Sequence, residues 1–216
     1  MVDKEVAYIA ILLRNILGIL TVRRVKMKIW ELKSSFDDYQ SFQLLSLEED
    51  SKKYFEGKID SAVKAFHSWG EIRIKCVEEG DRSDFPHFWG EVGTPMVSEK
   101  AKQFLESMLG NNVEFLPLIH NVTGEVYYII NVLNAIDAID YEKAILKKLR
   151  SGLVIDFKKY AFLPNMVKNQ TIFKVYLNEI LHIPSVFVLD EFRNAVLESD
   201  LKGFEFVEVW DSKADM

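Results

Sequence analysis

The chain has 216 residues, of which 49% are hydrophobic and 28% charged, and its formal net charge at pH 7 is −6. This balance, with only 10 Gly and 5 Pro, is typical of a globular protein and excludes a disordered, collagen-like or membrane class. The acidic excess argues against nucleic acid or an anionic membrane as partner, because phosphate binding depends on clustered Lys and Arg.

Residues 1–26 differ from the rest of the chain. Val6–Val22 is mostly apolar, but its length is near the short limit of about 17 to 25 residues for a membrane span, and Arg14 is unfavourable at its centre. If both arginines of Arg23–Met27 are encoded by AGG, this stretch resembles a bacterial ribosome-binding sequence read in frame. We therefore favour Met27 as the true start, with residues 1–26 a non-native leader. The alternatives are an apolar anchor or a genuine amphipathic helix. A membrane partner is expected only if residues 6–22 are translated and exposed.

Residues 27–216 are expected to form a single domain with room for two lobes, because no linker-like or low-complexity stretch divides them. Ile72, Ile74 and Cys76 alternate with Arg73 and Lys75, which is the period of two of a strand. Cys76 is therefore expected in the core. A single cysteine cannot form an intramolecular disulfide, so the cytoplasm is the favoured compartment.

A hairpin is predicted in the middle of the chain. Val126–Ile130 is apolar on both faces, as in a strand covered on both sides, and Val113–Ile119 is its natural neighbour. The segment Asn121–Gly124 between them has the residues of a tight turn.

Two segments have the same order of elements. Residues 95–118 read as a strand, a helix capped by Ser98 and ended by Gly110, and a second strand. Residues 184–209 repeat that order, with Asp190 as the expected N-cap. These patterns predict an α+β fold, a mixed sheet with hairpins and two strand-helix-strand units, whose helices pack on the sheet.

Catalytic and metal-binding patterns are sparse. The four histidines, His67, His87, His120 and His182, have no second ligand type at metal spacing, and we expect no metal and no cofactor. Asp137 and Asp140 are three residues apart and could share a helix face, but capping and solvation are much commoner roles for such a pair.

The stretch from Glu78 to Gly90 has an unusual composition, because acidic residues run directly into aromatic ones. Charged residues beside aromatic residues are typical of binding hot spots, although large aromatic side chains more often fold back onto the core. The expected partner-binding residues are Glu78, Glu79, Asp81, Asp84, Phe88 and Trp89.

Several blocks, in this order and spacing, resemble the eleventh immunity-protein family of bacterial polymorphic toxin systems. They are Asp84–Pro86, Thr94–Ala101, Glu114–Leu118, Tyr127–Val132 with Asp137 and Asp140, Phe187–Phe192 and Leu201–Phe204. The resemblance spans most of residues 83–209, is loose over residues 27–70 and does not include residues 1–26.

The resemblance implies a cytoplasmic bacterial protein, not an enzyme, that binds and neutralises a cognate toxin by occlusion. An acidic surface suits a basic toxin domain such as a nuclease. The alternative is a small hydrolase or transferase that uses Asp137 and Asp140, or His87.

Overall fold

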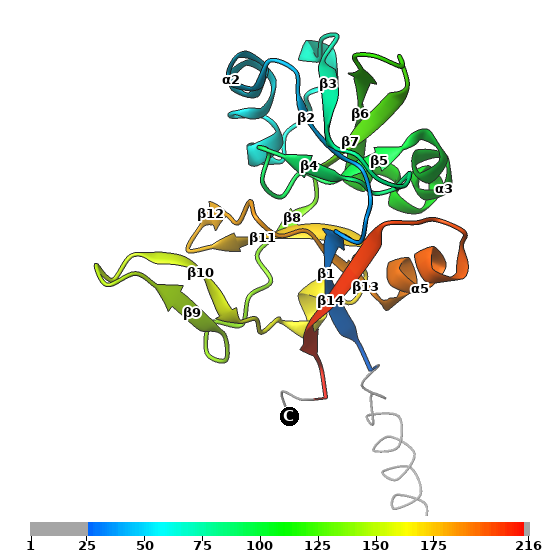
Figure 1. The fold of residues 1–216 in the computed structure, drawn as a ribbon. Helices are drawn as coiled ribbons and strands as arrows, with labels where there is room; N and C mark the ends of the chain where they lie inside the picture. Colours follow the sequence, from blue (N-terminus) through cyan, green and yellow to red (C-terminus); the bar gives the residue numbers. More distant parts are fainter. Residues whose placement is uncertain (1–25, 214–216) are drawn as a thin grey trace, which may run out of the picture.

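The computed structural model describes residues 26–213, which form two mixed β-sheets, one above the other in Figure 1. The expectations for residues 1–25 lie outside the described residues. The α+β class is confirmed, but the strands divide between two six-stranded sheets and one two-stranded hairpin.

The first sheet has the strand order β4-β2-β3-β6-β7-β5. Its strands pair antiparallel except at two places, where β2 runs parallel to β4 and β3 parallel to β6. The strands are β2 (Ser41–Leu44), β3 (Arg73–Glu78), β4 (His87–Trp89), β5 (Met96–Ser98), β6 (Val113–His120) and β7 (Val126–Val132).

The second sheet has the order β12-β11-β13-β1-β14, and β8 pairs parallel with β11. Its strands are β1 (Lys28–Ser34), β8 (Ala135–Ile136), β11 (Ile172–Leu177), β12 (Ile180–Leu181), β13 (Phe187–Leu189) and β14 (Phe204–Asp211). A separate hairpin of β9 (Ile145–Lys148) and β10 (Val154–Lys159) projects to one side in Figure 1.

The helices are few and mostly short. They are α2 (Leu47–Asp50), α3 (Glu99–Leu109), α4 (Pro164–Val167) and α5 (Asp190–Glu198), with the π-helical turn Ser51–Phe55 and the 3₁₀ turns Ile59–Ser61, Phe66–Ser68 and Gly110–Asn112.

Both predicted strand-helix-strand units are present, as β5-α3-β6 and β13-α5-β14. In each unit the two strands do not touch, because a third strand lies between them and runs antiparallel to both. The inserted strand is β7 in the first unit and β1 in the second. The two units thus have the same spatial arrangement but a different order along the chain. Strand β7 follows the first unit, whereas β1 comes long before the second unit.

The helix starts agree with the sequence in one unit only. The Ser98 hydroxyl accepts a hydrogen bond from the backbone N–H of Ala101 at 3.1 Å, as an N-cap does. Asp190 is instead the first residue of α5, so its expected N-cap role is wrong. Its carboxylate accepts the indole N–H of Trp30 at 2.9 Å, a contact that ties α5 to β1 across the sheet.

The predicted hairpin and strand are confirmed. Strand β7 pairs with β6 through the turn at residues 121–124, where Gly124 has a φ of 72°. Ile72 and Ile74 are buried, while Cys76 is only half-buried and its thiol contacts the carbonyl oxygen of Glu78 at 3.0 Å. Burial raises the pKa of that thiol.

Three apolar clusters form the core. One lies on the outer side of the first sheet, where Phe42, Leu116 and Ile129 meet, and another on the outer side of the second sheet around Phe162 and Phe187. The central cluster draws side chains from both sheets and from both long helices, including Leu105 of α3 and Phe192 of α5. We call it the central cluster below, because it joins the two sheets.

Candidate protein-binding surface

Two loops at one end of the first sheet bring carboxylates together. The backbone N–H of Asp81 donates to the carbonyl of Asp38 at 2.7 Å, and the N–H of Gln40 donates back to the carbonyl of Asp81 at 3.0 Å. This close approach requires Gly80, since a β-carbon there would lie 2.3 Å from the carbonyl oxygen of Asp38. The sequence did not indicate that the loop after β1 would join the loop after β3.

The acidic surface is the exposed set that results from this pairing: Asp37, Asp38, Glu78, Glu79 and Asp81. The two aspartates before β2 are additional to the residues expected from sequence. Carboxylates from two loops give a higher local density of negative charge than one loop could provide.

Aromatic side chains border the acidic surface. Trp89 is 40% exposed and Phe36 is 64% exposed, and their ring centroids are 6.3 Å apart. The indole N–H of Trp89 donates to the hydroxyl of Ser41 at 2.9 Å, and that hydroxyl donates to the carboxylate of Glu78 at 2.7 Å. These bonds fix the orientation of the indole ring and leave part of it accessible to a partner.

His87 lies between the two exposed rings. Its ring centroid is 4.6 Å from that of Phe36 and 4.3 Å from that of Trp89, and its Nδ1 is 2.9 Å from the hydroxyl oxygen of Ser34. Burial lowers the pKa of His87, and the charge of Glu78 acts in the opposite direction with less effect. The imidazole therefore favours its neutral form and acts as a third aromatic ring in this cluster.

Two of the six residues expected from sequence point inward. Phe88 is buried in the core on the outer side of the first sheet. Asp84 accepts hydrogen bonds from the hydroxyl of Ser98 at 2.7 Å and from the backbone N–H of Lys202 at 3.0 Å, and it lies 3.6 Å from the ammonium of Lys100. Both residues support the scaffold, whereas the other four share the exposed surface.

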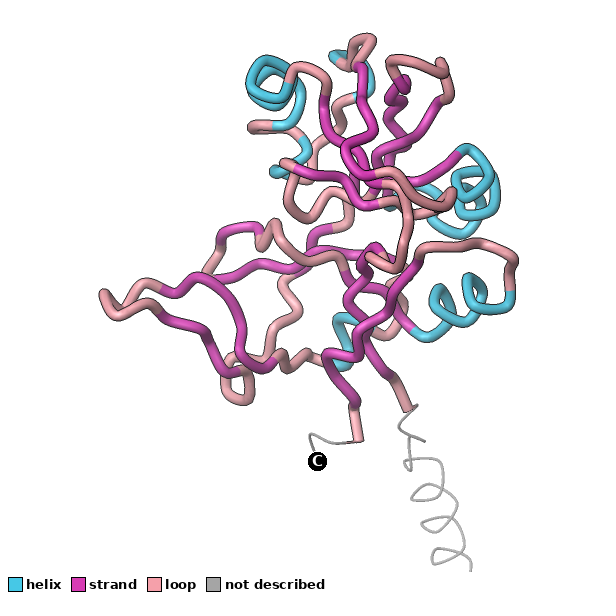
Figure 2. The backbone as a smooth tube through the Cα atoms, in the orientation of Figure 1, coloured by secondary structure: helices cyan, strands magenta, loops and turns pink. Residues whose placement is uncertain are grey.

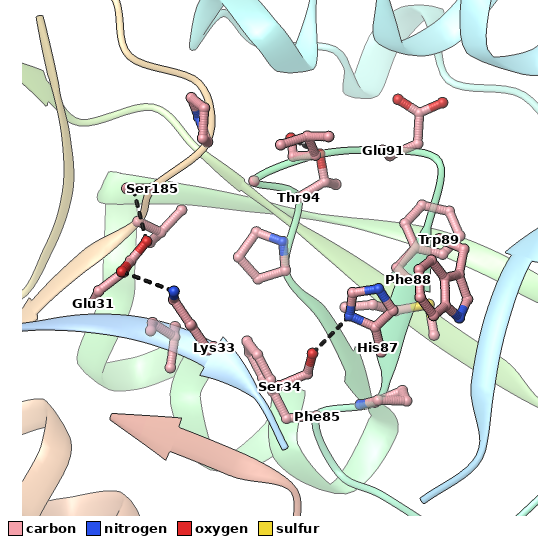
Figure 3. A pocket seen from close by; sticks show the side chains of 18 of the residues that line it. Glu31, Lys33, Ser34, Phe85, His87, Phe88, Trp89, Glu91, Thr94 and Ser185 are labelled. Atoms are coloured by element: carbon pink, nitrogen blue, oxygen red, sulfur yellow. Dashed lines mark hydrogen bonds and ion pairs between the residues drawn. The ribbon is translucent and has the colours of Figure 1, made fainter. Parts of the chain in front are cut away.

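A cleft of about 610 Å³ is lined by the aromatic cluster, by β1 and by the base of the β9-β10 hairpin. Figure 3 shows Glu31 and Lys33 on one side and His87 and Trp89 on the other. Asp156, Phe157 and Tyr160 also line it.

A chain of polar contacts leads from residues that line this cleft to the buried His182. The hydroxyl of Ser185 donates to the carboxylate of Glu31 at 2.8 Å and lies 3.2 Å from the hydroxyl of Tyr160. That phenol is 3.4 Å from Nε2 of His182, which is 3.5 Å from the carboxylate of Asp156. Burial lowers the pKa of His182 and raises that of Tyr160, so both groups favour their neutral forms.

The residues of the alternative enzyme hypothesis are not brought together. From the sequence, Asp137 and Asp140 could share a helix face. Residues 135–140 are not helical, so the two carboxylates do not have that arrangement. Asp137 lines a different cavity from the one that His87 lines. Asp140 accepts the backbone N–H of Glu142 at 3.2 Å, an ordinary turn contact.

Residues 26–213 contain no group of three or more His, Cys, Asp or Glu side chains placed to hold a metal ion. In the same range, no helix has both the length and the apolar character that a membrane crossing needs.

One protein-family model matches most of the chain. A model described as Immunity protein family (Imm11) matches residues 37–211. The chain belongs to this family. The match includes both loops of the acidic surface and both strand-helix-strand units, and it begins earlier than the blocks at residues 83–209 indicated. No protein with a curated description matches the chain significantly.

Proposed function

We propose that this immunity protein binds the toxin domain of a polymorphic toxin system in the bacterial cytoplasm and neutralises it by occlusion, without catalysis. The observation that carries the proposal is the exposed acidic surface with Trp89 and Phe36 beside it, in a chain of the immunity family. Carboxylates that are concentrated on one surface attract a basic domain, and a partly exposed tryptophan held by hydrogen bonds offers a preorganised anchor.

The two parts of the surface are expected to act on different rate constants. Exposed charges steer association and contribute little net affinity, because solvent and salt screen them. An aromatic ring that becomes desolvated at an interface acts mainly on dissociation, and its truncation commonly costs about 2 kcal/mol or more, roughly thirtyfold in lifetime.

The experiment measures binding kinetics between this chain and the toxin domain encoded by the neighbouring gene. Glu79→Lys with Asp81→Lys is expected to slow association, with a smaller difference from wild type at high salt. These two carboxylates are chosen because Glu78 also accepts the hydroxyl of Ser41. The matched control is Glu191→Lys with Glu198→Lys on the exposed face of α5, which makes the same change in net charge.

Trp89→Ala is expected to leave association nearly unchanged and to shorten the lifetime of the complex. A Tm measurement accompanies this variant, because the indole also donates to Ser41. Equal association rates for wild type and the Glu79/Asp81 variant would remove the acidic surface from the interface.

Occlusion and catalysis make different predictions for single polar residues. With occlusion, His87→Ala, Asp137→Ala and Asp140→Ala each leave toxin neutralisation within a modest factor of wild type. Loss of protection in one of these folded variants, with toxin binding intact, would instead identify an enzyme.

A further inference from the structure

The β9-β10 hairpin is an arm that stands apart from both sheets. Within residues 26–213 its two strands pair only with each other, and Figure 2 shows them projecting from the body of the molecule. We define the arm as residues 142–160. A two-stranded hairpin is marginally stable by itself, so an arm of this kind depends on its base for support.

The base of the arm is anchored and its tip is exposed. Phe157 is buried, and Leu146 and Tyr160 pack with it against the second sheet. At the tip, the backbone N–H of Leu149 donates to the carbonyl of Leu153 at 2.9 Å, and their side chains are 48% and 62% exposed. Apolar side chains displayed at the end of a projecting element are typical of an interaction site.

The charge of the arm is opposite to that of the body. Residues 142–160 contain six basic and two acidic residues, a net charge of +4. The rest of residues 27–216 contains 16 basic and 29 acidic residues, a net charge of −13. Phosphates of a membrane or a nucleic acid would be attracted by the arm but repelled by the body, whereas a compact acidic protein surface can meet the arm alone.

The chain itself carries such a surface. The acidic surface offers five exposed carboxylates beside Trp89 and Phe36, which complement a basic arm with a leucine tip. The base of the arm and the aromatic border of the acidic surface line the same cleft, because Asp156 and Phe157 are among its residues together with Phe36 and Trp89. A reciprocal contact, in which each arm meets the acidic surface of the other copy, is isologous and relates the two copies by a two-fold axis.

We propose that the arm of one copy docks on the acidic surface of a second copy, and that the reciprocal contact closes a two-fold dimer. The contact uses the surface that the proposed function gives to the toxin, but it does not depend on that function. Dimerisation is measured without toxin, so failure of either proposal is seen separately.

Sedimentation velocity of the full chain over about 1 to 200 μM tests the dimer, because charge-driven contacts of moderate size commonly have micromolar dissociation constants. At low salt the mass is expected to rise from 25.1 kDa towards twice that value. High salt is expected to weaken the dimer at least roughly tenfold, because the contact pairs exposed charges. A mass of 25.1 kDa throughout the range overturns the proposal.

Variants locate the contact. Lys148→Glu, Arg150→Glu and Lys158→Glu together are expected to abolish the dimer, because they place carboxylates against carboxylates. The matched control changes three exposed lysines outside the arm, Lys52, Lys64 and Lys168, to Glu. Leu149→Ser with Leu153→Ser tests the apolar tip at constant charge and is expected to weaken the dimer at least roughly tenfold.

A charge swap gives the sharpest readout. Combining the three arm substitutions with Glu79→Lys and Asp81→Lys is expected to restore the dimer that either set alone removes. A dimer that persists in the arm variant overturns the proposal. So does a wild-type monomer that binds vesicles of phosphatidylcholine and phosphatidylglycerol through the arm, because the partner would then be a lipid surface.

Discussion

Leu105→Ala tests whether the two sheets fold as one unit. Leu105 lies on α3, is fully buried and belongs to the central cluster, which also contains Val188 of the second sheet and Phe192 of α5. We propose that residues 27–216 are a single domain. If so, a cavity made beside α3 destabilises the second sheet as much as the first.

The size of the effect follows from burial. Leu→Ala in a packed core costs about 3 to 4 kcal/mol, because the lost apolar contacts add to the free energy of the cavity. Unfolding about 190 residues has an entropy near 0.4 kcal/mol per degree, at about 2 cal/mol/K for each residue. The expected fall in Tm is therefore about 9 °C.

The assay combines calorimetry with hydrogen exchange. A single transition that shifts as a whole is expected, with amides of β7 and β13 losing protection by the same free energy. Leu197→Ala on α5 is the control, since that leucine is 55% exposed and its loss is expected to change stability by less than about 0.5 kcal/mol. Two separate transitions, with only the first sheet destabilised in the Leu105 variant, would refute the reasoning.

Three further results are expected. A chain that starts at Met27 should have the Tm of the full chain, and loss of folding would contradict this expectation. The reason is that the described fold already holds Met27 in place: it is buried, its backbone N–H donates to the hydroxyl of Ser212, and its carbonyl accepts the backbone N–H of Ser212. Thermal denaturation should show stability falling as pH drops below about 6.5, because the lowered pKa values of His182 and His87 let the unfolded chain bind protons that the folded chain excludes. His182→Asn should reduce this pH dependence and leave the part due to His87. Denaturant titration should show a larger loss of unfolding free energy for Gly203→Ala than for Gly152→Ala. Both glycines have positive φ, but only at Gly203 would a β-carbon lie 1.9 Å from the Ser83 hydroxyl oxygen. Equal losses of unfolding free energy would show that the Ser83 side chain moves to make room.

Local patterns in the sequence were sufficient for several elements. The alternation around Ile74, the turn at residues 121–124 and the Ser98 cap each depend on residues within a few positions of one another. The family resemblance was also visible in the sequence, because it rests on blocks in a fixed order. These features need no knowledge of which strands become neighbours.

Other features were decided only by tertiary structure. Strand β1 enters between β13 and β14 from about 160 residues away, and no local signal marks that choice. The role of Asp190 follows from it, since its partner Trp30 is on β1. The same holds for Asp37 and Asp38, which join the acidic surface only because Gly80 lets two distant loops pair.

The sequence by itself determined the two strand-helix-strand units, the acidic charge and the aromatic residues near Trp89. The fold determined which of these aromatic residues faces solvent, burying Phe88 and leaving Trp89 partly exposed on adjacent positions of β4. It also placed the base of the basic arm and the aromatic residues Phe36 and Trp89 at one cleft. The physical reason is that alternation assigns residues to opposite faces of a strand, while only the packing of two sheets decides which face is covered.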